Sequence, residues 1–221
     1  MNVLYEDNHL LVVVKEANLP MQEDESHDVD LLTLGKRYLR EKYAKTGNIY
    51  LGLVHRLDRP VGGVVVLAKT SKAAGRLSES IRKHEITKEY LAIVEGKLPD
   101  EGVLKDTLKK DEKSNTSKVV RSDDPEGKDA ELSYRVLKHD LNLSLIQIQL
   151  VTGRSHQIRV QFSSRGNPLW GDARYNRNAK PGQQIALWAV RLSFPHPVTK
   201  EIMDFTSNPP RNLPWTKFNI K

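Results

Sequence analysis

The sequence predicts an α+β fold built around a mainly antiparallel sheet. Strand-like and helix-like segments follow one another without the regular alternation of a doubly wound fold, and strands dominate from Leu132 onward. Hydrophobic residues make up 38% of the 221 positions, enough to bury a substantial core in one domain. The sequence has no internal repeat and no low-complexity tract, so one compact unit is expected.

The first half of the chain is expected to contain two helices among its strands. Residues 10–14 form an apolar, largely β-branched run, which predicts a buried strand. Asp30 precedes apolar residues spaced three and four apart, which predicts a capped helix reaching about residue 45. Ser71 is expected to cap a second helix. Further strands are expected at residues 49–54, 64–67 and 89–94.

The second half is expected to be mostly strand. Residues 105–128 are polar and lack periodicity, which indicates an exposed excursion or a hairpin. Residues 143–151 form the strongest strand, but their alternation changes face between Leu145 and Ile146, and a bulge would explain the change. A helix is expected at about 155–164, strands at 185–194 and 202–205, and a short helical turn after residue 208.

Charge and composition narrow the class of partner. Lys and Arg number 35 against 28 Asp and Glu, giving a net charge of +7, which favours a polyanion such as nucleic acid, although other basic proteins share this balance. The absence of cysteine excludes disulfides, thiolate metal sites and cysteine nucleophiles. No leader-like segment and no apolar run of membrane-spanning length occurs, so we expect a cytoplasmic protein without a membrane partner.

A charged loop separates the strands expected at 49–54 and 64–67. It carries Arg56, Asp58 and Arg59 between apolar segments. A carboxylate held among cations has a lowered pKa and stays ionised at neutral pH, which suits a nucleophile or a base. The alternative is a turn stabilised by surface ion pairs, and the loop taken alone fits either interpretation.

Two further blocks carry polar or aromatic side chains. Thr152 and Gly153 stand directly before a helix bearing Arg154 and Arg159, and such a helix start suits an anion, although solvated basic residues are the alternative. Tyr90 lies among apolar strand residues, where tyrosine usually belongs to the core or the sheet surface. It gains interest because a flipped base needs an aromatic face or a phenol partner.

Together the three blocks resemble the RluA-type pseudouridine synthase family, which modifies uridines in ribosomal and transfer RNA. Residues 55–58 read HRLD, residues 88–90 fit the family's KxY segment, and residues 153–159 fit its GRxHQ[IL]R segment. Residues 166–175 resemble its GxPxxGDxxY run, and residues 4–14 resemble its opening strand. HRLD alone is weak, but these motifs in this order and at these separations are a strong signal.

The resemblance implies a single pseudouridine synthase catalytic domain over residues 1–221, with a central RNA-binding cleft and no separate N-terminal RNA-binding domain. The expected partner is ribosomal or transfer RNA, and none of these motifs selects between the two. The reaction breaks the N-glycosidic bond of uridine, rotates the uracil and rejoins it through carbon, so nothing is oxidised and no cofactor or metal is expected. Nothing in the sequence defines an oligomeric state.

The resemblance also assigns roles to individual residues. Asp58 is the expected catalytic carboxylate, either forming a covalent adduct or drawing a proton from the ribose, and Arg159 pairs with it. Tyr90 packs on the target base, and Arg56 enters the RNA stack as the uridine leaves it. Further substrate contacts are expected from His55, Arg154, His156 and Gln157. Phosphate contacts are expected from Lys109, Lys110, Lys113, Lys118 and Arg121, for which a solvated surface loop is the alternative.

The sequence departs from the family pattern at two places. The family usually continues HRLD with two residues and then Thr-Ser-Gly, whereas this chain has Val61, Gly62 and Gly63 in the corresponding places. The strand that usually closes in Asn-Lys-Pro reads Val14, Lys15, Glu16 here. Two rival functions remain: an RNA-binding protein that has lost catalysis, and a metal-dependent phosphodiesterase using Asp58, His55, His156 and Asp172.

Overall fold

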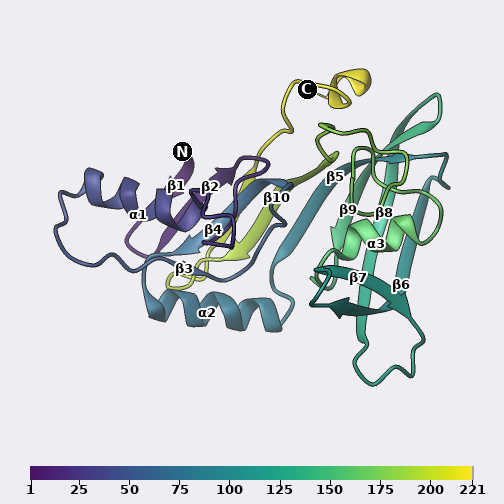
Figure 1. Cartoon of the computed structure of the whole chain (residues 1–221). Helices are drawn as coiled ribbons and strands as arrows, with labels where there is room; N and C mark the ends of the chain where they lie inside the picture. Colours follow the sequence, from purple (N-terminus) through teal and green to yellow (C-terminus); the bar gives the residue numbers. More distant parts are fainter. Residues whose placement is uncertain (221) are drawn as a thin grey trace. The chain divides into compact units, whose positions relative to one another are not determined.

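The computed structural model describes residues 1–220, and the chain divides into two compact units (Figure 1). The first unit comprises Met1–Lys88 and Ala189–Ser207, and the second comprises Glu89–Trp188 and the segment from Asn208 onward. The boundaries fall inside two strands, β5 (Thr87–Glu95) and β10 (Leu187–Pro195). The expected single catalytic domain over the whole chain stays a prediction.

The first unit is a sheet with two helices. Its strands lie in the order β1, β2, β4, β10, with β11 beside β10 and β3 beside β4, and β2 is antiparallel to both of its neighbours. The strands are β1 (Asn2–Glu6), β2 (Leu10–Lys15), β3 (Gly52–Leu53), β4 (Gly62–Ala68) and β11 (Ile202–Thr206), and the helices are α1 (Leu31–Lys42) and α2 (Ser71–Arg82).

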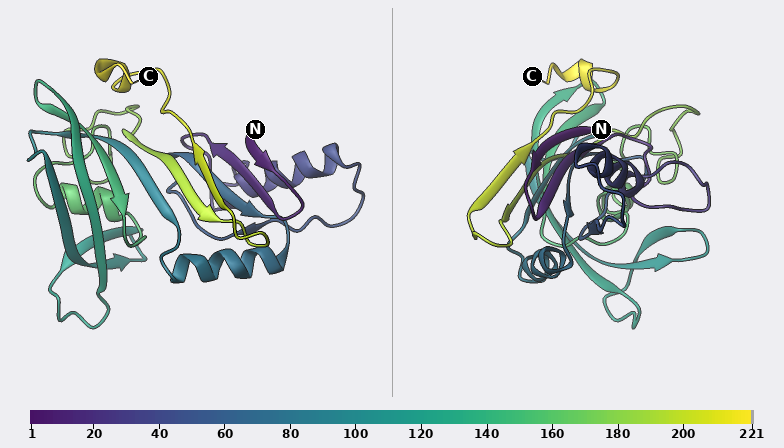
Figure 2. Two further views of the ribbon diagram at one scale, coloured as in Figure 1. Left: turned by 180° about the vertical axis from the view of Figure 1, so that it is seen from behind. Right: turned by 90° about the vertical axis from the view of Figure 1, so that its left-hand side faces the viewer.

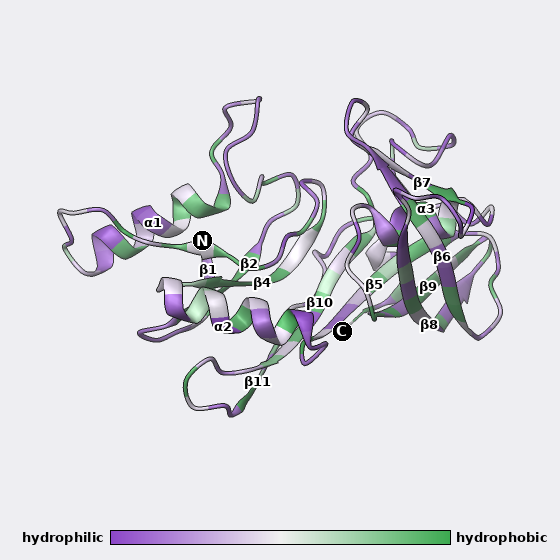
Figure 3. Ribbon diagram, turned by 90° about the horizontal axis from the view of Figure 1, so that it is seen from below, coloured by the Kyte–Doolittle hydropathy of each residue, from purple (hydrophilic) through white to green (hydrophobic). Residues whose placement is uncertain are grey.

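The two helices cover opposite faces of this sheet (Figure 2). Leu10 and Val12 of β2 pack with Ala73 and Leu77 of α2. On the other face α1 approaches closely at Gly35, where an added Cβ would lie 2.6 Å from the Leu51 side chain and also contact Leu67 and Leu11. Because both faces are covered, β2 and β4 are continuously apolar, as the hydropathy colouring shows (Figure 3).

Helix positions in this unit agree with the sequence pattern, whereas one strand does not. The Asp30 side chain accepts a hydrogen bond from Thr33 N–H and caps α1, as predicted. The cap of α2 is Thr70, whose hydroxyl accepts from Ala73 N–H, so the expected Ser71 is the first helical residue instead. The strand predicted at 49–54 is wrong, because only Gly52–Leu53 pair in the sheet. Ile49 and Leu51 are buried without strand pairing, and Leu51 lies against Gly35 of α1.

The second unit is an antiparallel sheet in the order β5, β9, β8, β6, β7. Its remaining strands are β6 (Glu101–Asp111), β7 (Thr116–Val120), β8 (Lys128–Asp140) and β9 (Leu143–Leu150). Helix α3 (Gln157–Ser163) contacts β6 and β7, and the 3₁₀ helix η1 (Trp215–Phe218) contacts β8. Of the two alternatives for residues 105–128, the hairpin is therefore correct, and the predicted α+β class is confirmed.

The predicted bulge lies at the expected level of the sheet but on the neighbouring strand. The pairing of β8 with β9 shifts between Val136 and Lys138, opposite Ile146 and Leu145. The extra residue is therefore Leu137 of β8. β9 itself is regular, because its pairing with β5 runs without a shift from Leu143 to Gln149. The apolar pattern of β9 changes between Leu145 and Ile146 because both side chains are buried.

Candidate active site

His55 begins the HRLD loop, which connects β3 to β4 in the first unit. Its Nε2 accepts a hydrogen bond of 3.1 Å from the backbone N–H of Val66. Burial, with the nearby Lys88 ammonium adding to the effect, lowers the pKa of His55 from 6.5 to about 4. The ring is therefore neutral at physiological pH and holds the start of the loop against β4.

Lys15 ties the end of β2 to the residue that follows Asp58. Its side chain is fully buried, and its Nζ donates to the backbone carbonyls of Leu19 at 2.7 Å, Glu16 at 3.0 Å and Arg59 at 3.0 Å. Burial lowers the pKa of Lys15 to about 7, while the Asp58 carboxylate acts in the opposite direction. No role was predicted for this lysine from the sequence, where it stands directly after an apolar strand and in the place of the lysine of the family's Asn-Lys-Pro segment.

The residues after Asp58 form a tight, apolar turn. Val61 N–H donates to the carbonyl of Asp58 at 2.9 Å, and the Val61 side chain is buried. Gly63 has a φ of +130°, and a Cβ there would lie 2.3 Å from the Ala189 carbonyl oxygen, so only glycine fits. Where the family has hydroxyl side chains, this chain therefore packs a valine into the core.

Arg59 extends away from this turn to an acidic segment between β2 and α1. Its guanidinium pairs with Asp24 at 3.3 Å and with Asp28, and it donates to the Ser26 hydroxyl at 2.8 Å. Arg56, two positions before Asp58, is exposed. The loop is thus fixed on both sides of Asp58, and the exposed arginine stands on its outer surface.

Arg159 is the centre of the corresponding group in the second unit. It is buried on α3, and its Nε and Nη2 donate to the two carboxylate oxygens of buried Asp172 at 2.8 and 2.7 Å. Asp172 also accepts from the backbone N–H groups of Arg174 and Tyr175. The Tyr175 ring lies 5.1 Å from the Arg159 guanidinium carbon. The sequence analysis quoted Asp172 within a motif but did not identify it as the partner of Arg159.

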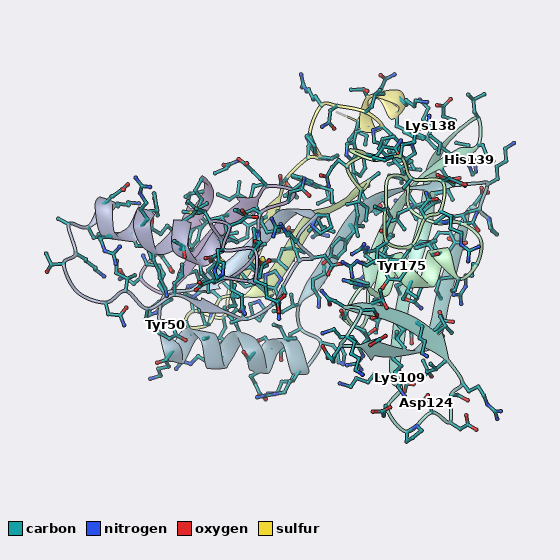
Figure 4. All side chains as sticks on the ribbon, viewed as in Figure 1. Tyr50, Lys109, Asp124, Lys138, His139 and Tyr175 are labelled. Atoms are coloured by element: carbon teal, nitrogen blue, oxygen red, sulfur yellow. The ribbon has the colours of Figure 1, made fainter. Side chains whose placement is uncertain are left out.

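His156 and Gln157 build the backbone before α3. His156 adopts a left-handed conformation with φ of 54°, and its Nδ1 lies 2.7 Å from the hydroxyl of Tyr175, which stands beside α3 (Figure 4). The side-chain amide oxygen of Gln157 accepts from Arg154 N–H and from the Thr152 hydroxyl. Its side-chain NH₂ group donates to the backbone carbonyl of Glu131. These side chains are buried and shape the loop, whereas the exposed Arg154 is fastened through Nε to the Asp129 carbonyl.

The structure thus distributes the predicted site residues over both units. Asp58, Arg56 and His55 belong to the first, and the remaining predicted residues belong to the second. Tyr90 is buried in β5, opposite Ile148 of β9. A hollow of about 520 Å³ on the sheet of the second unit has two Glu and two Gln among the nine residues of its lining and involves none of the predicted site residues.

Several cations predicted to bind phosphate are engaged with carboxylates. Lys109 pairs with Asp124 at 3.6 Å and also with Glu126 (Figure 4), and Lys110 and Arg121 pair with acidic residues two positions along the chain. Such exposed pairs are weak, so an anionic ligand can compete for them. Within residues 1–220, no three His, Asp or Glu side chains gather as metal ligands would, and no helix has the length and apolarity to cross a membrane.

Comparisons with known proteins agree with the motifs. Residues 9–164 match the family described as RNA pseudouridylate synthase. The chain is 33% identical to the ribosomal large subunit pseudouridine synthase D of Zymomonas mobilis subsp. mobilis, over 96% of this chain and 70% of the relative. It is 32% identical to the uncharacterised RNA pseudouridine synthase YhcT of Bacillus subtilis, over 92% of this chain and 67% of the relative.

The fold has a solved counterpart in human RNA pseudouridylate synthase domain containing 4. The two share a TM-score of 0.79 at 23% identity, over 95% of this chain and 89% of that chain. The architecture is therefore that of a pseudouridylate synthase domain. Because the family match also spans most of the sequence, the chain belongs to the RNA pseudouridylate synthase family, and its resemblance to the RluA-type enzymes is confirmed.

Proposed function

We propose that this enzyme isomerises uridine in large-subunit ribosomal RNA, with Asp58 as its catalytic carboxylate. The observation that carries the choice of RNA is the likeness to synthases named for the ribosomal large subunit, which extends over 96% of the chain. The net charge of +7 suits a ribosomal RNA substrate, because phosphate contacts supply much of the affinity for RNA. A cytoplasmic location goes with this substrate and stays a prediction.

Asp58 is proposed to act on the sugar or the base while the glycosidic bond of uridine breaks. Its neighbours favour this role, because Lys15 fixes the adjacent carbonyl and Val61 closes the turn. A side chain whose backbone is fixed on both sides loses little entropy when it meets its substrate. The covalent route and the proton-abstraction route both begin from this carboxylate.

Arg159 is proposed to pair with Asp58 during turnover. Asp172 supports this proposal because it holds two guanidinium nitrogens in one plane and so fixes the direction of the whole group. A planar guanidinium can present a second edge to another carboxylate, which a lysine ammonium cannot imitate. Asp172, Tyr175, His156 and Gln157 are then positioning residues for this arginine and its helix.

Tyr90 and Arg56 are proposed to handle the target nucleotide. A uridine that leaves the RNA stack costs a few kcal/mol, and a side chain that fills the gap together with an aromatic contact to the base offsets this cost. Arg56 is exposed on the loop of Asp58, which suits insertion into RNA, and Tyr90 is held by its strand. The base then rejoins the sugar through carbon, and the proton on that carbon is released.

The test is to map pseudouridine in total RNA from cells with and without the gene, and to restore the gene as wild type or as Asp58→Asn. The proposal expects one or more uridines of large-subunit ribosomal RNA to lose their modification and to regain it only with the wild type. A missing site in transfer RNA would instead assign the enzyme to that RNA. If Asp58→Asn restores the modification, Asp58 is not the catalytic carboxylate, and if no site disappears, the chain binds RNA without modifying it.

A further inference from the structure

The C-terminal half of α1 and the residues after it are strongly basic, although the active-site argument uses none of them. Residues 36–45 contain five Lys or Arg and one acidic residue, Glu41. Glu41 pairs with Arg37 at 2.9 Å and neutralises it. Figure 3 shows hydrophilic residues alternating with hydrophobic ones along this helix, as expected where one side packs on the sheet and the other faces solvent.

Two of these cations share one stripe of the helix with an exposed aromatic ring. Lys36, Arg40 and Tyr43 are spaced four and three residues apart, so their side chains leave the same side of the helix. Within residues 1–220, neither Lys36 nor Arg40 makes a hydrogen bond or an ion pair with another side chain. Both are therefore available to an external anion at no cost in internal contacts.

Tyr43 sits among three further lysines. Its ring is 47% exposed and has the ammonium groups of Lys69, Lys42 and Lys45 at 5.0, 5.6 and 5.6 Å from its centre. Its hydroxyl donates to Glu6 at 2.7 Å, which fixes the ring in place. Aromatic rings held beside cations are the elements with which proteins contact nucleic acid, since bases stack on the ring and phosphates meet the cations.

Glu6 is the carboxylate that organises this cluster. Burial raises its pKa, but hydrogen bonds from Lys42, Lys69 and Tyr43 outweigh burial and lower the pKa of Glu6 to about 2. Glu6 is thus ionised throughout the physiological range. One carboxylate offsets only one of the surrounding positive charges, so the cluster stays cationic. We define the α1 basic patch as the set Lys36, Arg40, Lys42, Tyr43, Lys45 and Lys69.

The patch lies at the opposite end of β4 from the catalytic loop. The loop containing Asp58 leads directly into Gly62 of β4, whereas Lys69 directly follows Ala68, the last residue of that strand. A strand rises about 3.3 Å per residue, which places Lys69 roughly 20 Å from the start of β4. The patch and the catalytic loop are thus separate parts of the same unit.

We propose that the α1 basic patch binds the phosphate backbone of the RNA substrate at a distance from the target uridine. A polyanion fits the patch because, apart from Tyr43 and the nearly buried Lys69, its members are cations that reach the solvent. A protein partner would require an apolar centre, and Tyr43 is the single aromatic ring among these six side chains. With about one phosphate of each strand per 3.4 Å of helix axis, the patch contacts a duplex RNA roughly six nucleotides from the nucleotide at the catalytic loop.

The test compares two double variants in equilibrium binding to a transcript of large-subunit ribosomal RNA, over a range of salt concentrations. Lys36→Gln with Arg40→Gln removes two cations from the patch. The control, Arg82→Gln with Lys83→Gln, removes two exposed cations from the end of α2, outside the patch. Phosphate contacts carry no sequence information, so the result does not depend on whether this RNA contains the target uridine.

The patch variant should bind roughly tenfold more weakly at moderate salt, and the slope of log affinity against log salt should become shallower by about 2, one for each lost contact. The control should shift neither quantity by as much. Unchanged binding by the patch variant overturns the proposal, and so does an equal loss in both variants, which would reflect net charge alone. If naked RNA binding is unchanged while binding to ribosomal particles weakens, the partner of this surface is a protein.

A second measurement uses the length of the RNA. A hairpin trimmed to about three nucleotides on each side of its modified uridine is too short to reach the patch, whereas a version extended by ten or more nucleotides reaches it. The patch variant should raise the KM for the long RNA relative to the KM for the short one. An equal rise for both lengths would place the defect at the catalytic loop and overturn the proposal.

Discussion

The catalytic loop of the first unit and the arginine segment of the second are held in place by different means. The loop is fixed on either side of Asp58, because Lys15 donates to the Arg59 carbonyl and the His55 ring accepts from Val66 N–H. The arginine segment is fixed through side chains, because Asp172 binds Arg159 with both carboxylate oxygens. In the first unit, the contacts position Asp58, whose side chain is proposed to react. In the second unit, the contacts hold the side chain of Arg159 itself.

The difference follows from what each residue has to do. For Asp58, the bond from Lys15 to the next carbonyl and the turn closed by Val61 fix the peptide groups from which the carboxylate extends. A guanidinium does not change its protonation state and has donors to spare, so a permanent carboxylate partner orients it without blocking it. Substitutions that remove the support of Asp58 and substitutions that remove the support of Arg159 should therefore differ in their effects on stability and on turnover.

The largest effect is expected for Asp172→Asn. This change removes the negative partner of a buried arginine, and breaking a buried pair on one side costs about 3–5 kcal/mol of unfolding free energy. The amide also loses part of its ability to accept from the backbone N–H groups of Arg174 and Tyr175. Urea unfolding measures the loss, and pseudouridine formation should fall with it because Arg159 is no longer aimed.

Two further variants show whether the expected losses come from the contact of both Asp172 oxygens with Arg159 or from charge alone. Asp204→Asn breaks the exposed pair with Arg191 and should cost no more than about 1 kcal/mol. Arg159→Lys keeps the charge but lacks the fork, so we expect it to cripple turnover even where the protein stays folded. Near-normal single-turnover rates for Arg159→Lys would contradict its proposed role. Equal losses of unfolding free energy for the Asp172 and Asp204 variants would contradict the importance of the buried Asp172–Arg159 pair.

Lys15→Met is expected to have the next largest effect. It leaves the carbonyls of Leu19, Glu16 and Arg59 without their buried donor, which should lower the unfolding free energy by about 2–3 kcal/mol. Turnover should fall as well, because the peptide after Asp58 loses its support. Lys72→Met, on the exposed side of α2, is the matched control and should change stability by less than about 0.5 kcal/mol.

The pH dependence of this pair gives a second readout. Burial lowers the pKa of Lys15 from 10.5 to about 7 in the folded protein, so the unfolded chain binds the extra proton between these values. Unfolding therefore becomes less favourable as pH rises from about 7 toward 10.5. The stability advantage of the wild type over Lys15→Met should grow over this range. A constant difference would show that the lysine is not desolvated in the fold.

The sequence predicted best where short-range patterns decide the structure. The buried strand β2 followed from an unbroken apolar run, and the start of α1 followed from Asp30 as its cap. The failure at 49–54 has a physical reason, because burial against a helix produces the same apolar pattern as burial in a sheet. The bulge belongs to β8, and the pattern in β9 that suggested it comes from the burial of both Leu145 and Ile146.

The supports of the candidate site were beyond the reach of these patterns. Lys15 donates to the carbonyl of Arg59, which lies 44 positions along the chain, and the residues around Lys15 do not predict that acceptor. The partner of Arg159 lies 13 positions away across a loop, and among many carboxylates only folding selects Asp172. Motifs therefore named candidates for the chemistry, whereas the groups that position them required coordinates.

The smallest expected effect is that of His55→Gln, and it is a change in how the stability of the protein depends on pH in the acidic range. In the folded protein burial lowers the pKa of His55 from 6.5 to about 4, so the unfolded chain takes up a proton first as pH falls. The stability that the neutral ring contributes is complete above pH 6.5 and is lost as pH falls toward 4. His55→Gln lacks this titration, so its difference from the wild type should shrink over the same range. A constant difference between His55→Gln and the wild type would mean that the catalytic loop is not anchored by a neutral, desolvated ring.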